Sequence, residues 1–203
     1  VGLQYFPTKR LLLDVRAGER AYGKSYEAKA SWFKKHQNFS LLYRELIVNY
    51  YQEKLQQLNG SRALALGASA LQFQPEMRQD LFIKKNLAGQ WLIQGARSFV
   101  SIQPFYEKRL AANANLKERA HGLNGEIGWK RNSKWHYGVS GGFSRQWLIN
   151  EVQDKRWQIE AKAEQALGSK TKLLYQVHHF ELERSLYGKV RENTVSLALN
   201  WQG

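Results

Sequence analysis

The sequence predicts an all-β fold, and three observations together indicate a transmembrane antiparallel barrel. Apolar and polar residues alternate with a period of two along most of the chain, which is typical of strands with two different faces. The alternating segments are long, about 10–14 residues, whereas strands of soluble proteins usually have ~5–6. Short polar turns alternate with mostly longer connections, as they do in outer-membrane barrels.

Composition excludes several other classes of protein. The chain has 203 residues, with 31 Lys and Arg against 17 Asp and Glu, and a formal charge of +14. It contains no cysteine, which excludes a disulfide scaffold and a thiolate zinc site. The longest stretch without a charged residue, Ala63–Pro75, is 13 residues long, and a spanning helix needs ~20. An aromatic fraction of 13% with few prolines argues against disorder.

The alternation places charged and apolar residues on opposite faces of each predicted strand. In residues 157–164, for example, Trp157 and Ile159 oppose Glu160 and Lys162. The same pattern is clearest in residues 11–18, 26–33, 123–130, 135–144 and 194–201.

The turns predict how often the chain crosses the membrane. Tight turns are expected at 7–9, 35–38, 95–97, 131–134 and 168–170, and longer connections near 110–117, 147–154 and 184–189. If all tight turns share one side, the number of crossings between Asn38 and Gly95 is even. Phe39–Val48 and Leu81–Gln94 supply two, so Tyr50–Gln79 is expected to be one long loop; the alternative is a further pair of crossings there, one of them at Arg62–Gln74.

Residues 1–203 are therefore expected to form a single β-barrel domain of about eleven strands, the first of them incomplete. Bacterial barrels have even numbers of strands. The sequence thus predicts the C-terminal part of a larger barrel, with upstream strands absent from the chain.

A soluble β-sandwich is the alternative fold, and the two faces argue against it. Its core would favour aliphatic side chains, whereas this apolar face is rich in Trp, Tyr and Ala. The tryptophans near segment ends fit the aromatic girdle of a membrane protein: Trp91, Trp129, Trp135, Trp157 and Trp201. The other face carries charges of both signs, which a small soluble core buries only at a large energetic cost but a wet lumen accepts.

The basic residues of the polar face are the candidates for lining the lumen. They are Arg16, Arg20, Lys29, Arg44, Lys84, Lys130, Lys162 and Lys172. For each of them the alternative role is a structural salt bridge with a lumen glutamate.

No catalytic residue, metal site or cofactor is predicted. Adjacent His178 and His179 point to opposite faces of a strand, so they cannot bind one metal ion together. Ser140, Ser144 and His136 share a face with Glu126 on the neighbouring strand, but serines and histidines line most lumens. The basic residues are dispersed along the strands and turns, which argues against a nucleic-acid-binding protein.

Several segments, in the same order, resemble a family of outer-membrane proteins. The similar segments are Tyr5–Arg10, Gly18–Tyr26, Asp80–Leu87, Tyr106–Arg109, and Tyr187 with Val190–Leu197. They resemble the outer-membrane proteins associated with PEP-CTERM/exosortase systems, which are encoded beside exopolysaccharide loci. The resemblance implies a bacterial outer-membrane location and a role in that pathway.

The sequence and the resemblance together predict a conduit for exopolysaccharide. Surplus Arg and Lys in the lumen would lower the electrostatic barrier to an acidic polysaccharide. The expected partners are outer-membrane lipid and a periplasmic polysaccharide-export protein, docked on the basic rim of short turns. Two alternatives remain open: a structural or adhesive barrel that transports nothing, and an outer-membrane enzyme that acts on polysaccharide or lipid.

Overall fold

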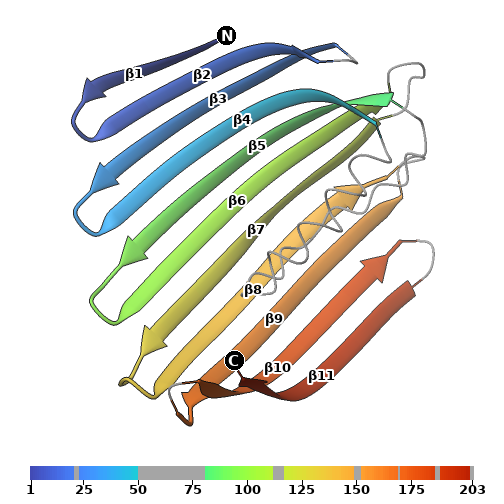
Figure 1. Ribbon diagram of the computed structural model, residues 1–203. Helices are drawn as coiled ribbons and strands as arrows, with labels where there is room; N and C mark the ends of the chain where they lie inside the picture. The colour runs from blue at the N-terminus through green and yellow to red at the C-terminus, as the bar shows by residue number, and fades with distance from the viewer. Residues whose placement is uncertain are drawn as a thin grey trace.

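The structure, a computed structural model, describes residues 1–20, 23–49, 81–111, 117–148, 152–168, 170–185 and 188–201. Within these ranges the chain forms eleven strands of one antiparallel sheet, and each strand pairs with its neighbours in sequence (Figure 1). None of the described residues belongs to a helix long and apolar enough to cross a membrane. The prediction of an all-β antiparallel fold is confirmed.

The eleven strands are long, apart from β1, which has 7 residues. Their bounds are β1 Gly2–Thr8, β2 Leu11–Arg20, β3 Gly23–Lys34, β4 Gln37–Asn49, β5 Leu81–Gln94, β6 Ser98–Ala111, β7 Lys117–Lys130, β8 Trp135–Trp147, β9 Gln153–Ala166, β10 Thr171–Arg184 and β11 Gly188–Trp201.

Strands β4 and β5 are direct neighbours although they are far apart in sequence. Their register runs without a break from Gln37 opposite Ile93 to Asn49 opposite Leu81. Among the described residues, β4 and β5 are the two crossings between the tight turn after β3 and the tight turn after β5. The loop expected at Tyr50–Gln79, and the alternative strand at Arg62–Gln74, lie outside the described residues.

The turns at one end of the sheet are shorter than the sequence indicated. Pro7 belongs to β1 and Asn38 to β4, so the first two turns consist of residues 9–10 and 35–36. Pro7 is tolerated because the register of β1 with β2 shifts between Tyr5 and Thr8, so the missing N–H group falls at an irregularity of the ladder. In the β7–β8 turn, Asn132 Oδ1 accepts the backbone N–H groups of Lys134 and Trp135, both at 2.9 Å.

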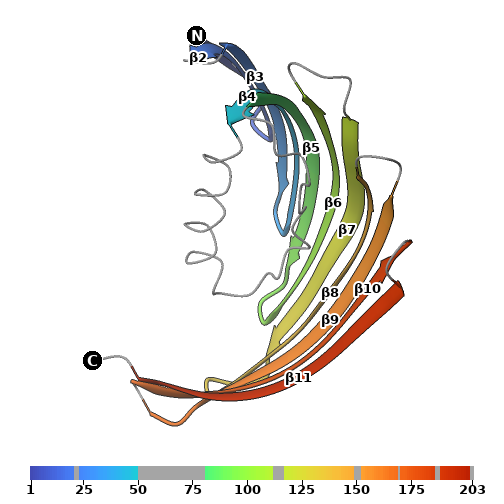
Figure 2. The same cartoon turned by 90° about the vertical axis from the view of Figure 1, so that its right-hand side faces the viewer.

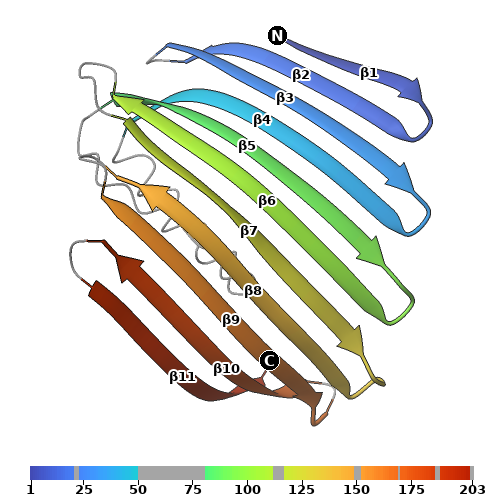
Figure 3. The same cartoon turned by 180° about the vertical axis from the view of Figure 1, so that it is seen from behind.

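The sheet is strongly curved, and β1 and β11 are the first and last strands in its order (Figure 2). Seen from behind, the strands slope in one direction across it (Figure 3). Side chains crowd together on the concave side of such a sheet and spread apart on the convex side. Among the described residues the buried side chains are mostly polar, and every buried polar side chain except that of Glu181 lies on the face opposite the tryptophans. The polar face is therefore the concave one, and the apolar face is the convex one.

Burial is inverted relative to a soluble protein. Among the described residues the buried apolar side chains are Val48, Phe82, Ala120 and Leu148. The buried polar and charged side chains are more numerous: Asp14, Ser31, Ser101, Glu107, Arg109, Glu118, Ser144, Gln146, Asp154, Arg156, Glu160 and Glu181. On the convex face Leu123 of β7 is 50% exposed and Val177 of β10 is 53% exposed, although both strands are paired on both sides. Large aliphatic groups exposed to this extent across a whole face indicate a lipid-facing surface.

Glycines on β7 leave room for aromatic rings on the concave face. A Cβ on Gly122 would lie 2.7 Å from the Phe105 ring and would also clash with the carbonyl oxygen of Phe143. Gly125, on the convex face of the same strand, has no atom closer to such a Cβ than the Ser101 oxygen at 3.8 Å. The two positions thus differ in space although they share one strand.

We expect Gly122→Ala to destabilise the barrel by about 1–3 kcal/mol, because the added methyl group overpacks a site that a backbone carbonyl closes. The measurement is urea unfolding in lipid vesicles, followed by tryptophan fluorescence. Gly125→Ala is the matched control and should leave the free energy of unfolding nearly unchanged. Equal effects of the two substitutions would contradict the packing argument.

Candidate functional site

The concave face carries ion pairs from its first strands onward. On β2, Arg16 Nη2 lies 2.6 Å from Asp14 Oδ2, and Gln4 of β1 donates to the same carboxylate at 3.2 Å. Between β3 and β4, Arg44 Nη2 lies 2.7 Å from Glu27 Oε2. The register places Gln4 opposite Asp14 and Glu27 opposite Arg44, whereas Arg16 and Asp14 are two residues apart on the same face of β2.

A buried cluster lies on β5 and β6. Glu107 Oε1 accepts Arg109 Nε at 2.7 Å, and its Oε2 lies 3.3 Å from Lys84 Nζ. The Arg109 guanidinium also lies 5.0 Å from the centre of the Phe82 ring. Across the β6–β7 register Arg109 is opposite Glu118, so this part of the wall places opposite charges next to each other.

A second buried cluster is centred on Asp154 of β9. Arg184 of β10 donates from Nε and Nη2 to the two carboxylate oxygens, at 3.0 and 2.9 Å. Arg156 Nη2 approaches the same carboxylate at 3.5 Å. The Asp154 side chain is fully buried, and two cations compensate for the loss of its hydration.

One ion pair crosses an intervening strand. Lys162 Nζ of β9 lies 3.2 Å from Glu126 Oε1 of β7, and β8 runs between them. Gly138 of β8 is opposite Lys162, and a Cβ there would lie 2.7 Å from Lys162 Cε. The lysine reaches the glutamate because Gly138 has no side chain. Further along β9, Glu164 accepts Lys172 Nζ at 2.9 Å.

The eight candidate lumen cations do not share one environment. Five of them form ion pairs with acidic residues of the concave face: Arg16, Arg44, Lys84, Lys162 and Lys172. Lys29 and Lys130 are exposed on the concave face, opposite Asp14 and His136 in register. Arg20 ends β2, and its side chain lies outside the described part of the chain.

Acidic residues accompany these cations along the whole concave face. They are Asp14, Glu27, Glu107, Glu118, Glu126, Asp154, Glu160, Glu164 and Glu192. The lining is thus a mosaic of both signs rather than a uniformly basic surface. Sequence alternation could place the charges on one face but could not show which of them would meet.

The convex face carries the tryptophans of the described residues. Trp91, Trp129 and Trp157 are about two-fifths exposed and Trp201 is 71% exposed. Trp135 is half-buried because it stacks between Tyr137 and Tyr175, with ring centroids at 5.7 and 6.4 Å. Alternation along β3 and β8 also places Trp32 and Trp147 on this face, and neither was among the predicted girdle residues.

The possible hydrolytic arrangement around His136 is absent among the described residues. His136 Nδ1 lies 3.6 Å from Glu164, not beside a serine, and Glu126 is paired with Lys162. His179 lies on the convex face against Trp157, at 4.6 Å between ring centroids, whereas adjacent His178 lies on the concave face. No three His, Asp or Glu side chains in the described ranges gather as a metal site would require.

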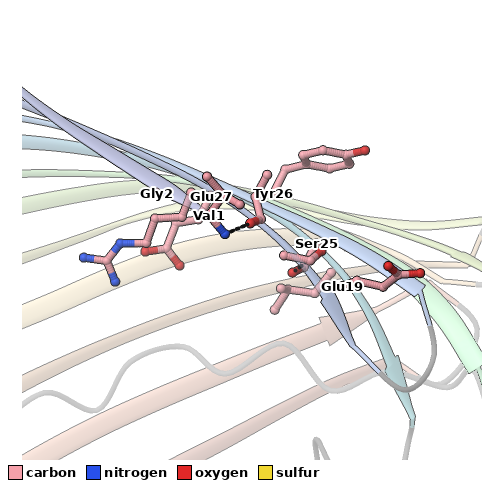
Figure 4. Close-up of a pocket in the computed structure, with 10 residues that line it drawn as sticks. Val1, Gly2, Glu19, Ser25, Tyr26 and Glu27 are labelled. Carbon is pink, nitrogen blue, oxygen red and sulfur yellow. Dashed lines mark hydrogen bonds between the residues drawn. The ribbon is translucent and has the colours of Figure 1, made fainter.

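A pocket lies at the upper end of β1–β3 (Figure 4). Its lining includes Val1, Arg16, Ser25 and Glu27 but no histidine. Arg16 is paired with Asp14, and the Ser25 hydroxyl donates to the Gly18 carbonyl oxygen at 3.2 Å. The pocket therefore offers no nucleophile with an adjacent base.

The fold is that of an outer-membrane β-barrel. Among solved structures the chain is similar to OmpT, an outer membrane protein of Vibrio cholerae that was folded in vitro, with a TM-score of 0.61 and 8% sequence identity. The match covers 98% of this chain and 60% of that protein, so the chain spans about three fifths of the length of that protein. No family model and no curated protein matches the sequence.

We expect lipids with brominated acyl chains to quench most of the tryptophan fluorescence of the barrel in vesicles, because the tryptophans occupy the convex face. Bromine near the headgroup should quench more than bromine near the chain end, since the girdle lies at the interface. Acrylamide, a water-soluble quencher, is the control. Strong acrylamide quenching without an effect of the brominated lipids would contradict a lipid-facing girdle.

We expect Asp154→Asn to destabilise the barrel by about 3–5 kcal/mol, because it leaves the two arginine side chains without their shared carboxylate. The control is Glu183→Gln on β10, which removes a half-exposed carboxylate paired with Lys155 at 3.1 Å and should change stability by ~0–1 kcal/mol. The free energies of unfolding of both variants are to be measured by urea unfolding. A loss below 1 kcal/mol for Asp154→Asn would show that the cluster is not structural.

Proposed function

We propose that the protein is an outer-membrane conduit through which an acidic exopolysaccharide leaves the cell. The observation that carries this proposal is the inverted polarity of the curved sheet, with an exposed aromatic and aliphatic convex face and a charged concave face. The likeness to an outer-membrane protein supports the barrel and its location in that membrane. The cargo rests on the resemblance to proteins of PEP-CTERM/exosortase systems.

The mosaic lining suits a polymer that must enter and leave without being trapped. The cations that are paired with a carboxylate, such as Arg44 and Lys162, exchange one anionic partner for another when an acidic sugar passes. Each exchange is close to neutral in energy, and repeated weak contacts favour movement over binding. The exposed Lys29 and Lys130 add attraction without an acidic side chain in contact with them among the described residues.

The end of the sheet with the short turns is the proposed docking side for a periplasmic polysaccharide-export protein. Short turns are periplasmic in outer-membrane barrels. The basic residues at or next to these turns are Lys9, Arg10, Lys34, Lys35, Arg131, Lys134 and Lys170. This rim would attract an acidic partner surface or the phosphates of the inner leaflet.

The proposed role is transport rather than catalysis. In the described part of the chain, the contacts of His136, Ser25 and Glu126 form no hydrogen-bonded set of nucleophile, base and acid such as a hydrolase needs. A structural or adhesive barrel is the competing role, and ion conduction distinguishes it from a conduit.

We expect the double variant Lys29→Glu and Lys130→Glu of the full-length protein to lose anion preference, because it replaces two exposed cations of the concave face by acids. The measurement is the anion-to-cation permeability ratio in planar bilayers, together with polymer release from cells. The change should shrink between about 0.1 M and 1 M salt, as screening requires.

The matched control is Lys24→Glu with Lys117→Glu, two exposed lysines of the convex face. It makes the same change in net charge and should leave permeability and release unaltered. Unchanged selectivity and release in the folded Lys29 and Lys130 variant would rule out the conduit and favour the structural barrel.

A further inference from the structure

A row of cations crosses the convex face near the ends of the strands that lead to the long connections. Lys85 of β5 is directly opposite Lys108 of β6, and Lys108 is directly opposite Arg119 of β7. On the next strands Arg145 of β8 is directly opposite Lys155 of β9. We call these five residues the basic row. Like charges that face each other across strands destabilise a sheet unless an anion lies between them.

Acidic side chains neutralise only the two ends of the basic row. Glu45 Oε1 lies 3.1 Å from Lys85 Nζ, and Glu183 Oε1 lies 3.1 Å from Lys155 Nζ. In the sequence Lys108 and Arg119 have acidic neighbours, Glu107 and Glu118, but alternation sends those carboxylates to the concave face.

The middle of the basic row has no carboxylate partner among the described residues. The Arg119 guanidinium lies 4.5 Å from the centre of the Trp147 ring, and that of Arg145 lies 6.0 Å from the Phe143 ring. Arg145 Nε is buried and has no hydrogen-bond partner in this part of the chain. Aromatic contacts hold the two guanidinium groups in place but leave their positive charge uncompensated.

The position of the basic row along the strands indicates which kind of group neutralises its positive charge. On β6, β8 and β9 the cation lies one two-residue step, ~7 Å along the strand, beyond a convex-face residue in the direction of the long connections. On β6, β8 and β9 those residues are Tyr106, Phe143 and Trp157, all exposed. An aromatic residue followed by a cation is the arrangement expected where acyl chains give way to headgroups.

We propose that the basic row binds the phosphate groups of membrane lipids in the leaflet on the side of the long connections. Adjacent strands are ~4.8 Å apart, so one phosphate can contact cations on two neighbouring strands. A guanidinium binds a phosphate through two parallel hydrogen bonds, and Arg119 presents its guanidinium at an exposed position. The aromatic residues Tyr106, Phe143 and Trp157, one two-residue step nearer the middle of the strands, would contact the acyl chains of the same lipid. This favours a lipid over free phosphate.

The proposal rests on the proposed outer-membrane location but not on the cargo. Its test uses the full-length protein in zwitterionic micelles, with bisphosphorylated lipid A as the probe. Native mass spectrometry measures the bound lipid, and a thermal melt measures the stabilisation. The comparison probes are the same lipid without its phosphates and inorganic phosphate at equal concentration.

We expect the phosphorylated lipid to bind at least ~10-fold more tightly than the dephosphorylated one, a difference of about 1.4 kcal/mol. The variant Lys108→Gln, Arg119→Gln and Arg145→Gln should lose this difference. The matched control, Lys29→Gln, Lys130→Gln and Arg44→Gln, removes three cations from the concave face and should retain it. If the triple variant does not fold, Arg119→Gln alone, at an exposed position, should reduce the difference several-fold.

Equal binding by the triple variant and its control would overturn the proposal, and so would inorganic phosphate that stabilises the barrel as much as the lipid does. Ion selectivity in planar bilayers should be the same for the triple variant and the unmodified protein. A loss of lipid binding with normal conduction therefore supports the basic row whether or not the barrel exports a polymer.

Discussion

The structure depends on one constraint, which is that backbone N–H and C=O groups surrounded by hydrocarbon must be bonded within the protein. In the described residues this is achieved by pairing each strand with its sequence neighbour over nearly its whole length. The β10–β11 register, for example, runs unbroken from Thr171 opposite Trp201 to Arg184 opposite Gly188. Because the backbone groups are bonded between strands, the two side-chain faces are free to differ in chemistry, and the sequence alternates accordingly.

The concave face shows how a chain with few buried apolar side chains still forms a defined wall. The largest fully buried side chains include Arg109, Glu118 and Asp154. A buried ion is costly unless an opposite charge and additional hydrogen bonds compensate it. Asp154 meets that condition through Arg184 and Arg156, and Glu107 meets it through Arg109 and Lys84. Complementary charges on neighbouring strands therefore take the place of a hydrophobic core.

The sequence was sufficient to predict the strands and the face on which each side chain lies. Both follow from the alternation of apolar and polar residues, which can be seen within a single segment. It placed Trp91, Trp129, Trp135, Trp157 and Trp201 on one face and the basic candidates on the other. The sequence was less successful for features that depend on how a strand pairs with its neighbour. Pro7 belongs to β1 because the register of that strand with β2 shifts beside it. The pairing of Lys162 with Glu126 needs both the register of three strands and the missing side chain of Gly138. Neither is visible in a single segment.

The two faces treat cations differently, and this difference separates two kinds of anion. On the concave face Arg44, Lys84 and Lys162 each have a carboxylate of the protein in contact, so an external anion must compete with it and can bind only weakly. On the convex face Lys108, Arg119 and Arg145 face other cations or aromatic rings. An anion that reaches them meets no such competition and can remain bound. Weak contacts suit a passing polymer, and persistent ones suit a lipid that stays with the barrel.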